Sequence, residues 1–86
     1  MSEYKILFDK SAGKEVDSLN INLAIRILDK IEMLSNNPRP MGCEKLKGEE
    51  NLWRIRVGSY RVIYSINDKN KVVNITIVRH RKDAYK

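Results

Sequence analysis

Apolar and polar residues alternate strictly on both sides of Gly58-Ser59, between residues 52 and 66. Strict alternation is typical of β-strands, and a two-residue link with glycine first favours a type II′ turn. The resulting hairpin pairs Arg56 with Arg61 and gives the chain an apolar face and a cationic face. The apolar face is predicted to contain Trp53, Ile55, Val57, Tyr60, Val62, Tyr64 and Ile66.

A further strand extends both faces of this hairpin. The turn-forming run from Asn67 to Asn70 predicts a four-residue loop, which would pair Ile66 with Lys71 and Arg61 with Thr76. In that register the apolar face gains Val73, Ile75 and Ile77. The polar face gains Asn74, Thr76 and His80. Three apolar residues, Ile63, Val72 and Val78, also lie on the polar face, so it is not purely hydrophilic.

The first half of the chain is predicted to be a structural scaffold, made of one strand and two helices. Residues 4–8 alternate as a strand, and a short helix is expected from about Lys10. Apolar residues spaced three and four apart predict a longer helix from Ile21 to Ser35, and the prolines that follow end it. The core-facing side chains are predicted to be Tyr4, Ile6, Phe8, Ala12, Val16, Leu19, Ile21, Ala24, Ile27, Leu28, Ile31 and Leu34.

These elements define an α+β fold in a single small domain, residues 1–86. The predicted order is β-α-α-β-β-β-β, and the last four strands lie near residues 44–47, 52–57, 60–66 and 72–79. Because a sheet and a helix each bury one apolar side, the two helices should cover the apolar face of a mainly antiparallel sheet. The opposite face should remain open as a shallow basic concavity.

Charge is distributed unevenly along the chain. Residues 1–43 contain 6 basic and 6 acidic side chains, whereas residues 44–86 contain 11 and 5. Arg56 facing Arg61 is destabilising in isolation and favours an anion between the two guanidiniums. The asymmetry therefore indicates a face that binds a polyanion, although a docking surface for an acidic protein segment and an ordinary solvated strand face remain open.

Other features narrow the class of protein. Cys43 is the single cysteine, and we expect it to be a packing residue. Because His80 is the single histidine, we expect no metal-ligand cluster and no cofactor. Apolar runs are only a few residues long and no charged-then-apolar leader precedes the first strand. We therefore expect neither a membrane protein nor a secreted one, and a cytoplasmic location.

The chain as a whole resembles the RelE/ParE superfamily of type II toxins. The resemblance rests on Asn37-Pro38-Arg39-Pro40, Lys45-Leu46-Lys47-Gly48, Leu52 to Gly58, Tyr60-Arg61-Val62-Ile63-Tyr64 and the closing His80-Arg81 to Tyr85. Its closing motif is more similar to the RelE branch, whose members cleave messenger RNA in the ribosomal decoding site without a metal. The ParE branch shares the fold but poisons DNA gyrase, so a gyrase inhibitor remains an alternative, as does a non-catalytic basic protein-binding module.

The resemblance also implies roles for individual residues. Arg61 would stabilise the transition-state phosphate, Arg81 or Arg79 would be the second phosphate-binding arginine, and Tyr85 would stack on the bases. His80 is the candidate proton acceptor because arginine is a poor one; alternatively it binds a phosphate or the chain's own tail. The predicted catalytic residues are Arg61, His80, Arg81 and Tyr85, and the predicted RNA-binding residues are Lys45, Lys47, Arg54, Arg56, Arg79 and Lys82.

The same resemblance implies partners. A type II toxin is held inactive by a cognate antitoxin protein whose segment wraps the toxin. The remaining partners would be the ribosome and its messenger RNA. We expect the free toxin to be monomeric and the toxin-antitoxin complex to be of higher order.

Overall fold

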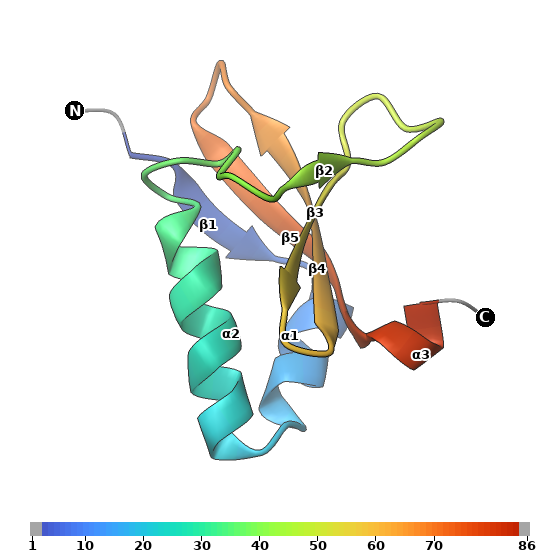
Figure 1. The fold of residues 1–86 in the computed structure, drawn as a ribbon. Coiled ribbons are helices and arrows are strands. Elements are labelled where there is room, and N and C mark those ends of the chain that lie inside the picture. The colour runs from blue at the N-terminus through green and yellow to red at the C-terminus, as the bar shows by residue number, and fades with distance from the viewer. Residues whose placement is uncertain (1–2, 85–86) are drawn as a thin grey trace.

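The computed structural model describes residues 3–84, so the predicted stacking residue Tyr85 lies outside the described residues. The fold is a mixed five-stranded sheet whose order is β1-β5-β4-β3-β2 (Figure 1). β1 runs parallel to β5, and every other neighbouring pair is antiparallel. The elements are β1 (Lys5–Phe8), α1 (Lys10–Asp17), α2 (Ile21–Met33), β2 (Glu44–Lys45), β3 (Trp53–Val57), β4 (Tyr60–Asn67), β5 (Val72–His80) and α3 (Arg81–Ala84). The α+β class and the predicted order of the first seven elements are confirmed.

The β3–β4 hairpin has the predicted register. Val57 pairs with Tyr60 and Arg56 with Arg61. Gly58 has a φ of 60°, and Lys71 is the only non-glycine residue in the described chain with a positive φ. A positive φ at the first turn position alone is the geometry of a type II′ turn, so the prediction from Gly58-Ser59 is confirmed.

The predicted register between β4 and β5 is wrong. Ile66 pairs with Val73 rather than Lys71, and an irregularity between Ile63 and Tyr64 shifts the strands again, so that Arg61 pairs with Arg79. The irregularity inserts one extra residue into β5, as a β-bulge does, and an odd insertion moves every later side chain to the other face. Val78 is therefore buried at 2% exposure in place of Ile77.

The bulge also reverses the predicted side of His80. His80 pairs with Tyr60 and therefore lies on the Tyr60 face, not on the polar face that carries Arg61.

The core lies between the sheet and the two longer helices (Figure 1). The predicted apolar stripe of α2 is too wide, because Ile21 is 70% exposed and Leu28 41%. Phe8, predicted to face the core, is 39% exposed. The buried apolar residues are Ala12, Val16, Ala24, Ile27, Ile31, Leu34, Ile55, Val57, Val62, Tyr64, Ile66, Val73, Ile75 and Val78.

Two polar contacts tie the loop after α2 to this core. The Tyr64 hydroxyl donates to the Pro38 carbonyl at 2.8 Å, and burial raises the pKa of the Tyr64 phenol. The Arg39 guanidinium lies 4.9 Å from the centre of the Trp53 ring, a cation–π contact. In the part of the chain that is described, no helix is long and apolar enough to cross a membrane.

Candidate functional site: a cationic hollow beside the hairpin turn

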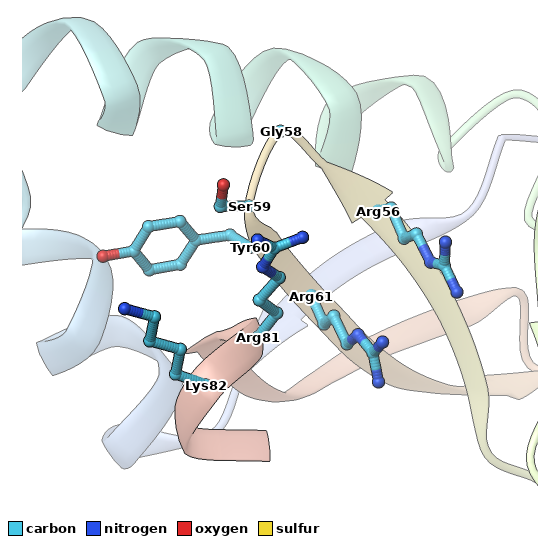
Figure 2. A pocket seen from close by; sticks show the side chains of 7 residues that line it. All are labelled: Arg56, Gly58, Ser59, Tyr60, Arg61, Arg81 and Lys82. Atoms are coloured by element: carbon cyan, nitrogen blue, oxygen red, sulfur yellow. The ribbon is translucent and has the colours of Figure 1, made fainter. Parts of the chain in front are cut away.

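A hollow of about 340 Å³ lies where the β3–β4 turn meets α3 (Figure 2). Three elements supply its cations: Arg56 from β3, Arg61 from β4, and Arg81 with Lys82 from α3. The type II′ turn brings the ends of β3 and β4 together, and the Arg81 N–H donates to the Ser59 carbonyl at 2.7 Å, which holds α3 against the turn. The complete lining is Arg56, Gly58, Ser59, Tyr60, Arg61, Arg81 and Lys82.

Three arginines form a row across adjacent strands next to this hollow. Arg61 pairs with Arg56 on β3 and with Arg79 on β5. The β-bulge produces the second pairing. Without the extra residue in β5, the register that pairs Ile66 with Val73 would place Arg61 opposite Val78. Like charges on paired strands repel, so the row is best stabilised when an anion lies against it.

Arg61 occupies the middle of this row and is only 9% exposed. β4 is the central strand of the sheet, and strands lie on both sides of it. The guanidinium is therefore partly withdrawn from water, where a charge-assisted hydrogen bond to a phosphate is stronger than at an exposed site.

Glu44 is a site residue that the sequence interpretation missed. Its carboxylate lies 2.9 Å from Arg54 and 4.0 Å from Arg56, measured from Oε2 and Oε1 to the respective Nη2 atoms. The antiparallel pairing of Glu44 with Arg54 places this carboxylate on the basic face. Only the exact register of a two-residue strand could have revealed it, because a shift of one residue would place neighbouring Lys45 on that face instead.

The predicted RNA-binding residues do not all lie on one surface. Arg56 and Lys82 line the hollow, and Arg79 lies beside Arg61. Arg54 is paired with Glu44. Lys45 pairs with Trp53 and lies on the helix side of the sheet, whereas Lys47 follows β2 in an exposed turn, so the predicted strand 44–47 is shorter than expected.

Of the predicted catalytic residues, Arg61 and Arg81 line the hollow and His80 does not. The His80 ring lies edge-on to the Tyr60 ring at 5.3 Å between centroids and 87° between planes. Its Nδ1 accepts the Lys82 N–H at 3.2 Å. His80 therefore contacts Tyr60 at the start of β4 and the backbone of α3.

The described side chains suit the binding of a phosphodiester. Arginine forks match phosphate oxygens in geometry and charge. Among residues 3–84, no group of three His, Cys, Asp or Glu residues is placed to hold a metal ion. The guanidinium and ammonium groups that line the hollow can stabilise negative charge on a phosphate.

A small mixed sheet with helices on one face and a row of arginines on the other defines a compact basic protein whose open face suits a polyanion. The chain belongs to the RelE/ParE superfamily: residues 4–85 match the family described as the ParE toxin of the type II toxin-antitoxin system parDE. It is thus a toxin of a type II toxin-antitoxin system.

Individual relatives agree with this assignment. The chain is 33% identical over 85 residues to toxin RelE3 of Methanocaldococcus jannaschii, with 94% of each protein covered. The fold is similar to a chain of the archaeal RelE-RelB complex from Pyrococcus horikoshii OT3, with a TM-score of 0.82, 34% identity, and coverage of 92% of this chain and 96% of that one. A chain of the intact E. coli RelBE toxin-antitoxin complex gives a TM-score of 0.79 at 28% identity, covering 90% and 95%.

Proposed function

We propose that this toxin is a ribosome-dependent endoribonuclease that cleaves messenger RNA and thereby stops translation. The observation that carries the proposal is the cationic hollow, where Arg61 and Arg81 approach one space from two different elements. The named relatives at 33% and 34% identity are RelE proteins, which supports the RNA-cleaving branch.

The proposed chemistry uses the 2′-hydroxyl of the message as the nucleophile. Attack on the neighbouring phosphate builds negative charge on its oxygens, and Arg61 and Arg81 would stabilise that charge as it develops. Arg56, Arg79 and Lys82 would hold the flanking phosphates, a contribution that supplies salt-dependent affinity rather than sequence choice. Tyr85 would stack on the bases, as the family resemblance implies.

A second candidate function is inhibition of DNA gyrase, since the matching family description is that of a ParE toxin. This alternative needs no 2′-hydroxyl and no transition-state stabilisation. It predicts that the cationic face binds a protein or DNA without breaking a phosphodiester bond.

The proposal includes a cognate antitoxin that neutralises the cationic face. The structural relatives from P. horikoshii and E. coli are complexes with an antitoxin, and a row of arginines favours an acidic occupant. The free toxin would be a monomer in the cytoplasm, where it meets ribosomes, and the complex with antitoxin would be of higher order.

Induced expression without the antitoxin tests the two candidates against each other. We expect amino-acid incorporation to stop within minutes while plasmid supercoiling stays normal. The reverse result, relaxed plasmids and an induced DNA-damage response with continuing protein synthesis, would replace the ribonuclease by the gyrase inhibitor.

A further inference from the structure

The junction between β5 and α3 contains a contact that points to a distinct role for His80. The His80 side chain stands immediately before α3, and its Nδ1 accepts the N–H of Lys82, the second residue of that helix. The first N–H groups of a helix have no partner within the helix, and a side-chain acceptor at the preceding position supplies one. We propose that His80 is a positioning residue that caps α3 through Nδ1, and thereby holds Arg81 and Lys82 at the cationic hollow.

The cap fixes the tautomer of the imidazole. An Nδ1 that accepts a hydrogen bond carries no proton, so in the neutral ring the proton is on Nε2. A ring in this state has no free nitrogen with which to take a proton from RNA. A proton-accepting Nε2 would require the proton on Nδ1, directed against the Lys82 N–H, and the cap would be lost.

The position of the ring leads to the same role. His80 pairs with Tyr60, on the face opposite Arg61, and its ring packs edge-on against the Tyr60 ring. Tyr60, Arg81 and Lys82 all line the hollow, whereas His80 does not. The imidazole thus contacts two residues of the lining, Tyr60 and Lys82, without lining the hollow itself.

A helix of four residues has little stability of its own, so its two attachments determine where it lies. One is the Arg81 N–H to the Ser59 carbonyl, and the other is the Lys82 N–H to His80. Figure 2 shows Arg81 and Lys82 extending from α3 beside the turn that carries Ser59. Loss of the second attachment would loosen α3, which carries both cations, while Arg81 and Lys82 themselves stay unchanged.

Asparagine and glutamine, substituted at position 80, distinguish a residue that caps α3 from one that accepts a proton. The Oδ1 of asparagine occupies the place of histidine Nδ1, one bond beyond Cγ, whereas the longer glutamine brings its amide to the region of Nε2. Asparagine is also a preferred N-cap residue and alanine a poor one. The informative variants are therefore His80→Asn, His80→Gln and His80→Ala.

The first measurement is amide hydrogen exchange on the free full-length protein, which is independent of any enzymatic activity. We expect the Lys82 amide to exchange about fivefold faster in His80→Gln and His80→Ala, the factor that corresponds to an N-cap of ~1 kcal/mol. His80→Asn should keep the parent rate. The Arg81 amide, which donates to Ser59, reports within each sample whether α3 stays attached at its other contact. Equal Lys82 exchange in the parent and the alanine variant would overturn the proposal.

The second measurement is message cleavage on ribosomes and rests on the proposed function. His80→Asn should retain most of the parent rate, whereas His80→Gln and His80→Ala should lose roughly 2- to 30-fold, the range expected for a lost cap. If His80→Asn is as inactive as His80→Ala while its Lys82 amide stays protected, His80 acts on RNA directly and the positioning role is wrong. If the parent cleaves nothing, the proposed function fails, and the exchange measurement still decides on the cap.

Discussion

Arg61 combines two properties that rarely occur together, a charge and 9% exposure. Its stem lies on the central strand between the partners Arg56 and Arg79, so its position is set by the sheet rather than by a flexible loop. A guanidinium held in this way needs little reorganisation when charge develops on a nearby phosphate, and this lack of reorganisation makes such groups effective in catalysis. The sequence interpretation placed Arg61 on the correct face but did not anticipate its burial.

Replacing Arg61 by alanine should lower the cleavage rate by about 100- to 1000-fold, the usual effect of removing one transition-state donor. Because the stem is buried, the variant should also unfold at a somewhat lower temperature, so both quantities are measured on the same sample. Lys69→Ala, which removes an exposed cation from the β4–β5 turn, is the control for loss of one positive charge and should leave the rate unchanged. A folded Arg61→Ala protein that cleaves at the parent rate would remove Arg61 from the mechanism.

Glu44 leads to a prediction in the opposite direction, because removing its charge should strengthen binding to RNA. Its carboxylate contacts Arg54 and Arg56 and so reduces the positive charge of the basic face. Glu44→Gln should increase affinity for ribosomes or RNA and steepen its salt dependence by up to about one unit in the log–log slope. Titrations of the parent and the variant at several salt concentrations measure both effects. Unchanged affinity and slope would mean that Arg54 and Arg56 do not meet phosphates.

At the scale of elements, the hairpin turn and the β-bulge decide the geometry of the site. The turn could be predicted, because Gly58-Ser59 between alternating strands has few other interpretations. The bulge could not, because an extra residue in β5 leaves no mark in a strand where Ile75, Ile77 and Val78 are all apolar. The bulge nevertheless decides on which face of the sheet the side chains of Arg79 and His80 lie. The sequence therefore predicted the fold and the identity of the cations, while their arrangement around Arg61 required the structure.

A pair of glycine substitutions tests the role of the turn. Gly58 has a φ of 60°, a conformation that an alanine adopts only with strain, so Gly58→Ala should lower the free energy of unfolding by about 1 kcal/mol. Gly13 lies inside α1, where an added Cβ would meet nothing within 4 Å, and Gly13→Ala should raise stability by roughly 0.5–1 kcal/mol. Urea denaturation of the two variants should therefore shift the midpoint in opposite directions. Shifts of the same sign would contradict the assignment of these two backbone conformations.

At the scale of the whole molecule, a cluster around Asp68 joins segments distant in the chain. The Arg39 guanidinium donates to both oxygens of Asp68, at 3.2 and 2.9 Å, and the Tyr4 hydroxyl donates at 2.6 Å. The cluster thus links the start of β1, the loop after α2 and the β4–β5 turn. The hydrogen bonds from Arg39, and then from Tyr4, lower the pKa of Asp68 to about 2 from an ordinary value of 3.8. Both ionic side chains are about half exposed, so water and salt screen the pair and its contribution is modest.

This cluster predicts how stability changes in acid. A carboxyl group whose pKa is lower in the folded state stabilises the fold above its unfolded pKa, and this contribution is lost as the pH falls toward the folded value. Asp68→Asn should therefore be less stable than the parent at pH 7, and the difference should shrink between about pH 4 and pH 2. Asp29→Asn, on the exposed side of α2, controls for the loss of one negative charge. Thermal unfolding across this range measures the effect, and a difference that stays constant down to pH 2 would exclude the cluster as its cause.

The central claim is that the cationic hollow cleaves messenger RNA on the ribosome, and a reconstituted reaction tests it most directly. Purified toxin is mixed with a labelled message, either free or positioned on ribosomes, and cleavage is followed for the parent and for Arg61→Ala. We predict cuts within the ribosome-bound message for the parent, little cleavage of free RNA, and a rate about 100- to 1000-fold lower for the variant. Ribosome-bound message that stays intact with folded parent toxin, in a preparation that inhibits gyrase, would contradict the account.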